Sequence, residues 1–234
     1  MIDYQAKDLS IERLYENYYS KRNPARVYPT EFVVRVFMSS YPNLSFTPPK
    51  TGNSILDIGF GDGRNTLFLC ELGLETAGIE ISDKIVALTS KRLSNLGHNP
   101  TLRVGRNNNI PFQNNYFDYI LACHSCYYCD ENETISDNLR EYHRVLRPNG
   151  FLIASVPDIN SYIFEGAQKL DDGTLRISFD PYGNRIGYRL HAFDGEKSIK
   201  NTFSKFFKNF SFGHAMNNYF GIDERVFWTV CQKR

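Results

Sequence analysis

The sequence predicts an α/β fold in which helices cover both faces of a mostly parallel sheet, a doubly wound arrangement. Three observations lead to this prediction. Short apolar runs alternate with amphipathic stretches between residues 54 and 157. The connections are long enough to hold the crossover helices that parallel neighbours require. A glycine-rich turn, GFGDG (59–63), follows the first apolar run and leads into a helical pattern.

The elements are predicted in order along the chain. The five strands are SILDIG (54–59), ETAGIE (75–80), TLRV (101–104), FDYILAC (117–123) and FLIASVP (151–157). Apolar residues spaced by three and four predict helices over residues 65–72, 82–96 and 132–146. Ser82 is a favourable N-cap, and Gly73 and Gly97 end the first two helices. A helix over 194–207 and two closing strands complete the domain.

The regions outside this alternation define the domain organisation. Residues 10–22 and 30–40 have helical patterns, and residues 41–53 carry three prolines, which is typical of a linker. We therefore expect an N-terminal helical cap and linker over residues 1–53 and the main domain over 54–234. Residues 158–192 are polar and rich in glycine and tyrosine, so they form an insertion, with a possible hairpin, that breaks the alternation.

Composition narrows the class of function. The 27 lysines and arginines nearly cancel the 26 aspartates and glutamates, so no global field favours nucleic acid or an anionic membrane. No apolar run approaches the ~18 residues of a membrane span. The first residues, MIDYQAKDLS, do not resemble a signal peptide. We expect a cytoplasmic protein, a monomer or homodimer, with reduced cysteines.

The glycine turn has acidic partners at the expected places. Gly59, Gly61 and Gly63 allow the backbone to approach a ligand closely, and Asp57 precedes them at the end of the first strand. Glu80 ends the second strand, where a carboxylate can accept both hydroxyl hydrogens of a ribose. A dinucleotide or S-adenosylmethionine would use this arrangement. The dinucleotide fingerprint wants a third glycine at the position of Arg64, which disfavours a nicotinamide cofactor.

The motif Asp57-Ile-Gly59-Phe60-Gly61-Asp62-Gly63 resembles motif I of the class I S-adenosylmethionine-dependent methyltransferases. Glu80-Ile81 resembles the ribose acid and adenine-packing residue of that family. Pro111-Phe112 before Tyr116-Phe117-Asp118, and LRPNG (146–150), resemble its later motifs. The resemblance covers residues 54–157 and implies a Rossmann-like seven-stranded sheet with an antiparallel last strand. The cofactor-binding residues that it implies are Asp57, Gly59, Phe60, Gly61, Asp62, Gly63, Glu80, Ile81, Asn107, Asn108 and Cys123.

One position departs from the family pattern. Many relatives place an acidic residue after the third strand to accept from the adenine amino group, but here Gly105 is followed by Arg106. Arginine has no acceptor atom. The side-chain carbonyl of Asn107 is our candidate substitute. The alternative is that residues 107–109, three consecutive asparagines, only form a turn.

The stretch CHSCYYC (123–129) follows the fourth strand and has the spacing of a metal site. Alternate residues of a strand face opposite sides, and a metal site wants about four ligands, so we expect no metal. The resemblance places this loop beside the methyl donor and the acceptor. His124 is then the candidate catalytic base, because its ordinary pKa of about 6.5 suits neutral pH. The alternative is a structural histidine.

The acceptor is predicted to be a small polar metabolite, methylated on oxygen or nitrogen. The N/D-P-P-Y/F motif of adenine and glutamine-amide methylation is absent after the fourth strand, as is the Pro-Cys pair of cytosine methylation. A sugar or sugar nucleotide would suit the polar insertion. The substrate-binding candidates are Tyr19, Arg26, Tyr127, Tyr128 and His191. Two other functions stay open: a non-catalytic nucleoside-binding partner protein and a nicotinamide-dependent oxidoreductase.

Overall fold

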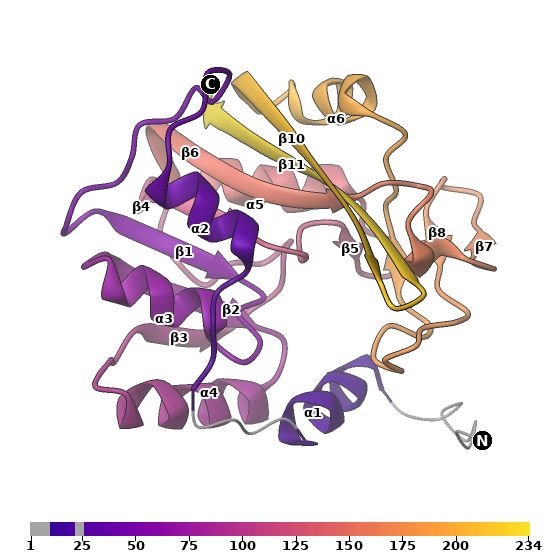
Figure 1. Cartoon of the computed structure of the whole chain (residues 1–234), viewed down its shortest axis with the longest axis horizontal. Coiled ribbons are helices and arrows are strands. Elements are labelled where there is room, and N and C mark those ends of the chain that lie inside the picture. Colours follow the sequence, from indigo (N-terminus) through magenta and orange to yellow (C-terminus); the bar gives the residue numbers. More distant parts are fainter. Residues whose placement is uncertain (1–9, 22–25) are drawn as a thin grey trace.

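A seven-stranded sheet in the order β10-β11-β6-β4-β1-β2-β3 forms the centre of the molecule (Figure 1). The computed structural model describes residues 10–21 and 26–234. The strands are β1 (Ser54–Ile58), β2 (Glu75–Glu80), β3 (Thr101–Val104), β4 (Phe117–Ala122), β6 (Leu146–Pro157), β10 (Phe207–Tyr219) and β11 (Ile222–Lys233). β1 pairs in parallel with β2 and β4, β2 with β3, and β4 with β6. The predicted α/β class with a mostly parallel sheet is confirmed.

The last strand runs against the others. β11 pairs antiparallel with β6 on one side and with β10 on the other, so β11 lies between them although it is last in the chain. Phe220 and Gly221 connect the two long strands, and both have positive φ angles (53° and 98°), as tight hairpin turns require. The antiparallel last strand implied by the family resemblance is thus confirmed.

Helices cover both faces of the sheet. They are α1 (Ile11–Lys21), α2 (Glu31–Met38), α3 (Arg64–Glu71), α4 (Asp83–Asn95), α5 (Ile135–Val145) and α6 (Glu196–Phe203). Leu56 of β1 packs in one hydrophobic cluster with Leu139 of α5 and Phe203 of α6. Its neighbour Ile55 packs in the other cluster with helices α2 and α3. Adjacent β1 residues therefore anchor opposite layers, as the two-residue period of a strand dictates.

The two N-terminal helices have different positions. Val33 of α2 is completely buried in the cluster that contains Ile55, and Phe32 stacks on Trp228 with ring centroids 4.5 Å apart. Helix α2 therefore shares the core of the main domain. Helix α1 instead lies across the carboxyl ends of the strands, at the edge where ligands of open α/β sheets bind (Figure 1).

The insertion forms a small sheet of its own. Its elements are η2 (Tyr162–Phe164), β7 (Gln168–Lys169), β8 (Leu175–Arg176) and β9 (Arg189–Leu190). The hairpin predicted here is present, because β8 pairs antiparallel with β9. β9 also pairs with β5 (Tyr128–Cys129), which belongs to the CHSCYYC loop. The two ends of the insertion meet at a neck, where the Ile159 amide donates to the Phe193 carbonyl at 2.8 Å and the Phe193 amide donates to the Pro157 carbonyl at 3.2 Å.

Candidate functional site

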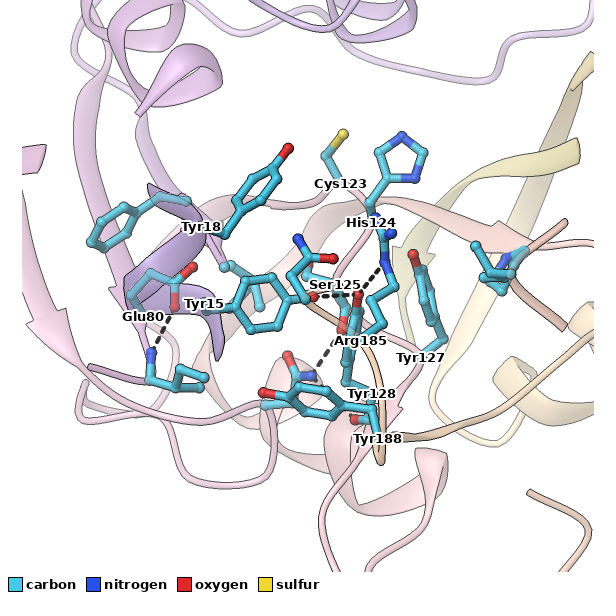
Figure 2. Close-up of a pocket in the computed structure, with 18 of the residues that line it drawn as sticks. Tyr15, Tyr18, Glu80, Cys123, His124, Ser125, Tyr127, Tyr128, Arg185 and Tyr188 are labelled. Carbon is cyan, nitrogen blue, oxygen red and sulfur yellow. Dashed lines mark hydrogen bonds between the residues drawn. The ribbon is translucent and has the colours of Figure 1, made fainter. Parts of the chain in front are cut away.

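A pocket opens at the carboxyl ends of β1, β2 and β4 and is bounded by α1, the 123–130 loop and the insertion (Figure 2). The predicted site residues that line it are Tyr19, Gly59, Phe60, Asp62, Glu80, Ile81, Asn107, Cys123, His124, Tyr127 and Tyr128. The predicted site residues outside its lining are Arg26, Asp57, Gly61, Gly63, Asn108 and His191. Figure 2 shows Glu80 at one side and Tyr127 at the other, with Tyr15 and Arg185 between them.

The glycine turn requires residues without a side chain. Gly59, Gly61 and Gly63 have φ angles of 68°, 54° and 80°, which other residues rarely adopt. A Cβ atom on Gly59 would lie 2.9 Å from Ser125 Cβ, and one on Gly61 would lie 2.2 Å from the Tyr19 hydroxyl. The turn therefore presents bare backbone towards the 123–130 loop and towards helix α1.

Glu80 is a buried carboxylate that the turn holds in place. Its two oxygens accept hydrogen bonds from the Gly61 amide (3.1 Å) and the Ile81 amide (2.8 Å). Burial raises its pKa to about 6, against the lowering effect of these two amides. Each carboxylate oxygen keeps a second lone pair, so Glu80 can still accept from the hydroxyls of a ribose.

Asp57 lies beneath the turn rather than in the pocket wall. It is 1% exposed and accepts a hydrogen bond from Thr66 of α3 at 2.7 Å. Burial raises its pKa to about 7. Gly63 likewise acts behind the wall, as the N-cap residue of α3. These two residues thus build the turn and anchor the helix that follows it.

The side chain of Asn107, the predicted adenine acceptor, lines the pocket and also makes contacts within the protein. Its side-chain nitrogen donates to the carbonyls of Ser125 (2.9 Å) and Tyr128 (3.3 Å), and its side-chain oxygen accepts from Tyr142 at 2.7 Å. The amide is therefore used to fasten the 123–130 loop to helix α5. Asn108 lies in the turn over residues 107–108, outside the pocket lining. Both residues lie in the turn of the alternative interpretation, and the adenine-acceptor role of Asn107 stays a prediction, since its oxygen keeps a second lone pair.

Arg106 has a role that the sequence did not reveal. Its guanidinium forms ion pairs with Glu12 of α1 (2.5 Å) and with Asp130 of the 123–130 loop (2.9 Å). Helix α1 is held further by Glu16, which accepts from the Ser82 hydroxyl at 2.5 Å. The residue that replaces the family's acid thus fastens α1 over the pocket.

His124 lies in the pocket lining, but its basicity differs from the prediction. Burial, assisted by the positive charges of Arg185 and Arg64, lowers its pKa to about 4. The imidazole is therefore neutral at physiological pH and is a weaker base than its ordinary pKa implies. Its backbone has φ of 54°, and its amide donates to the Ser155 hydroxyl at 2.7 Å. The argument from an unperturbed pKa was wrong.

The cysteines of CHSCYYC have separate partners. Cys123 contacts the Thr30 hydroxyl, Cys126 the Ser155 carbonyl and Cys129 the Tyr127 carbonyl. Burial raises the pKa of Cys123 and of Cys129 to about 12, so these thiols stay protonated. Within residues 10–21 and 26–234, no group of three His, Cys, Asp or Glu side chains is arranged to hold a metal ion.

Two predicted substrate residues lie elsewhere. Arg26 is on the surface, where it pairs with Glu71 at 3.5 Å, so its assignment to the acceptor site was wrong. His191 packs against Phe193, and its amide donates to the Tyr127 carbonyl at 2.9 Å. It supports the loop from behind, and its assignment to the acceptor site was also wrong. Both residues were chosen for their side-chain chemistry, and the sequence alone does not show on which side of the chain a side chain lies.

Several pocket residues were missed by reasoning from sequence. Those in the acceptor half are Tyr15, Tyr162, Arg185, Tyr188 and Glu224. Tyr15 and Tyr128 share a hydrogen bond of 2.7 Å between their hydroxyls, which joins α1 to β5. The available signal in the sequence was weak: a tyrosine-rich helix near the N-terminus and a polar insertion.

The comparisons with known proteins find similarity to methyltransferases. A family described as a methyltransferase domain matches residues 56–154. A solved S-adenosylmethionine-dependent methyltransferase from Methanosarcina mazei has a TM-score of 0.64, with 20% identity, over 81% of this chain and 99% of that one. Residues 56–154 of this chain are therefore similar to a methyltransferase domain, and the chain has the fold of solved S-adenosylmethionine-dependent methyltransferases.

Two curated relatives are also named as methyltransferases. The putative methyltransferase YqeM of Bacillus subtilis is 26% identical over 151 residues, which is 64% of this chain and 58% of that protein. The demethylmenaquinone methyltransferase of Tropheryma whipplei is 32% identical over 103 residues, 44% of this chain and 41% of that protein. The chain thus matches only about half the length of these relatives.

The residues present fit the family's cofactor. S-adenosylmethionine carries a ribose, an adenine, a sulfonium and a carboxylate. Glu80 offers acceptors to a ribose, and the apolar Phe60 and Ile81 line the pocket beside it. Arg64, at the start of α3, supplies a cation at the glycine turn, where it pairs with Asp62 at 2.7 Å. The cradle that a Cβ would fill at Gly59 and Gly61 completes the fit.

Proposed function

We propose that this protein transfers a methyl group from S-adenosylmethionine to an oxygen or nitrogen of a small polar acceptor. One observation carries the proposal. A single pocket joins the Glu80 side, which suits a nucleoside, to a second half lined by tyrosines and Arg185, which suits a polar partner (Figure 2). Two reactants held in one pocket gain much of the rate of an intramolecular reaction.

The chain's own residues would orient the reactants and exclude water. The cofactor, when bound, supplies a methyl group on a cationic sulfur. Glu80, Phe60 and Ile81 would hold its nucleoside part. Helix α1 covers the pocket with Tyr15 and Tyr19, both partly buried, and this limits the access of water. Positioning and desolvation are therefore the main contributions that we assign to the protein.

A hydroxyl or ammonium acceptor must also lose a proton. Two titratable groups in the pocket lining, His124 and Glu224, are candidates to receive it. The lowered pKa of His124 makes it the weaker base. Burial raises the pKa of Glu224, on β11, so that its carboxylate takes up a proton more readily than an exposed glutamate does. We therefore propose that Glu224, rather than His124, accepts the proton of the methyl acceptor.

The acceptor's class follows from the pocket and the charge balance. The polar, aromatic lining favours a small metabolite, for which a sugar or sugar nucleotide remains a reasonable first choice. The net charge of +1 does not favour nucleic acid. Within the described residues, no helix has the length and apolar character that crossing a bilayer demands. A cytoplasmic location and a monomeric or dimeric state remain predictions. The similarity to a methyltransferase domain disfavours the nicotinamide alternative.

Calorimetric titration with S-adenosylhomocysteine and with NADH tests the donor site. We expect the sulfur nucleoside to bind and NADH not to bind. Glu80→Ala should weaken S-adenosylhomocysteine binding by about 100-fold, because it removes a charged acceptor of two hydroxyl hydrogens. Glu75→Ala is the matched control, since Glu75 is exposed at the other end of β2. NADH binding, or equal effects of the two variants, would contradict the proposal.

Turnover with pooled polar metabolites then tests catalysis. We expect S-adenosylhomocysteine to accumulate only when a pool contains the acceptor. A protein that binds the donor but never turns over with any pool would instead support the non-catalytic alternative.

A further inference from the structure

The acceptor half of the pocket contains a buried cation that the assigned donor site does not use. Arg185 comes from the insertion, between β8 and β9, and its side chain is only 18% exposed. Figure 2 shows it among Tyr15, Tyr127, Tyr128 and Tyr188. A guanidinium in such surroundings is costly unless charged or polar groups compensate it. If the protein's own groups do not fully compensate Arg185, the remaining donor of its guanidinium is available to a ligand.

The protein satisfies Arg185 only in part. Its Nε donates to the Tyr128 hydroxyl at 3.1 Å, and its Nη1 donates to the Tyr162 hydroxyl at 3.4 Å and to Asp180 at 3.2 Å. Among the described residues, none forms a hydrogen bond with Nη2 of Arg185. This nitrogen also retains some exposure to solvent, since it is absent from the buried atoms that have no hydrogen-bond partner. One face of the guanidinium is thus open to the pocket.

Asp180 does not cancel this charge completely, because other donors share it. Its oxygens also accept from the backbone amides of Tyr182 (3.3 Å), Asn184 (3.0 Å) and Arg185 (3.0 Å). These contacts give Asp180 a clear structural role in the turn that carries Arg185. Glu224 is the other acid near Arg185, and no ion pair joins the two. The pocket therefore keeps an available positive group.

The cluster stays charged and donating at neutral pH. Burial favours the neutral form of Arg185, but the neighbouring tyrosines outweigh it and raise its pKa well above the ordinary value. Burial also raises the pKa of Tyr162 and of Tyr127, so these hydroxyls stay protonated. A guanidinium flanked by phenolic hydroxyls matches the planar, multi-oxygen geometry of a carboxylate or phosphate.

We propose that Arg185, with Tyr128 and Tyr162, binds an anionic group, a carboxylate or a phosphate, on the methyl acceptor. The inference deepens the proposed function and rests on it. The donor's own carboxylate is the other candidate, but Arg64 already provides a cation at the glycine turn. The partners of Arg185 lie in β5 and η2, which belong to the acceptor half. The acceptor is thus expected to be an anionic metabolite rather than a neutral sugar.

The test uses inorganic phosphate and acetate as probes on the full chain saturated with S-adenosylhomocysteine, at constant ionic strength. We expect one of the two anions to bind by calorimetry. Arg185→Gln should weaken that binding by about tenfold or more while leaving the affinity for S-adenosylhomocysteine within a factor of about two. Arg176→Gln is the control, because Arg176 lies in the same insertion but pairs with Glu131 outside the pocket. It should bind the anion as wild type does.

The possible outcomes distinguish a failure of the proposed anion site from a failure of the proposed methyltransferase function. Failure of the wild-type chain to bind S-adenosylhomocysteine would overturn the proposed function itself. Binding of that nucleoside without binding of either anion would overturn the inference alone. So would an Arg185→Gln variant that loses the nucleoside and keeps the anion, since Arg185 would then serve the donor. If Arg185→Gln does not fold, Tyr162→Phe replaces it, and unchanged anion affinity in that variant would count against the site.

Discussion

The two halves of the pocket are built in different ways. The donor half uses a continuous piece of chain, from the Gly59–Gly63 turn to Glu80, and its contacts are largely backbone contacts. The acceptor half combines α1, β5, the insertion with its η2 helix, and β11, and its contacts are between side chains. A continuous backbone motif can be recognised in the sequence, whereas a pocket wall assembled from four distant segments can hardly be recognised there.

The largest effect should come from a side chain at Gly59. Gly59→Ala places a Cβ 2.9 Å from Ser125 Cβ at a φ of 68°, so both strain and a clash oppose the native turn. We expect the free energy of unfolding to fall by about 3 kcal/mol and S-adenosylhomocysteine binding to be lost. Chemical denaturation and calorimetry measure the two quantities.

Gly97→Ala is the matched control for this variant. Gly97 has a φ of 85°, but a Cβ there would meet nothing within 4 Å, and the site is far from the turn in sequence. It should cost about 1 kcal/mol and leave binding unchanged. Equal losses of binding in both variants would mean that close approach at Gly59 does not define the donor half.

A smaller effect concerns pH and Glu80. Its pKa in the folded protein is raised to about 6, so the folded state binds more protons than the unfolded state between about pH 4.5 and pH 6. The free energy of unfolding therefore decreases as pH rises through this window. Relative to Glu80→Gln, wild type should lose about 2 kcal/mol between pH 4 and pH 7.

The comparison between the variants matters because other groups titrate in the same range. His124, whose folded pKa is lowered to about 4, contributes the opposite slope below its ordinary pKa. Subtracting the Glu80→Gln curve removes such common contributions. Glu75→Gln, at an exposed position, should reproduce the wild-type curve. Parallel curves for wild type and Glu80→Gln would show that the carboxyl is not buried in solution.

The smallest effect concerns Arg106, which attaches helix α1 to the 123–130 loop where the two halves of the pocket meet. Arg106→Gln removes ion pairs to Glu12 and Asp130, each partly exposed, so about 1 kcal/mol of the attachment of α1 should be lost. We expect S-adenosylhomocysteine affinity to fall by about threefold to tenfold and proteolysis within α1 to accelerate. Arg140→Gln, which breaks a surface pair with Asp137, is the control. Unchanged proteolysis in Arg106→Gln would remove Arg106 from this role.

The sequence was sufficient for most of the fold. Strands β2 and β3 begin and end where predicted, and β1 ends one residue before the prediction, at Ile58. Short apolar runs bounded by turn residues determine these limits locally. The Glu80 side of the pocket was predictable for the same reason. The packing of α2 on the main sheet depends on contacts with Ile55 and Trp228 that lie far away along the chain.

The acceptor side was predicted only in outline. The structural contacts of the Asn107 amide, with Ser125 of the 123–130 loop and Tyr142 of α5, join segments that no local pattern brings together. His124 was assigned an ordinary pKa because burial is a tertiary property. Arg26 and Arg185 are the same residue type, and only the fold shows that the second one lies in the pocket.

The neck of the insertion has a consequence for how this protein can diversify. Residues 157–159 and 193 are joined by backbone hydrogen bonds, so the segment between them leaves and rejoins the main chain at nearly one point. Closing such a loop costs little more when its length changes. The inserted segment can therefore vary in length and sequence while β9 stays paired with β5. Such variation would change the acceptor preference and leave the donor half of the pocket unchanged.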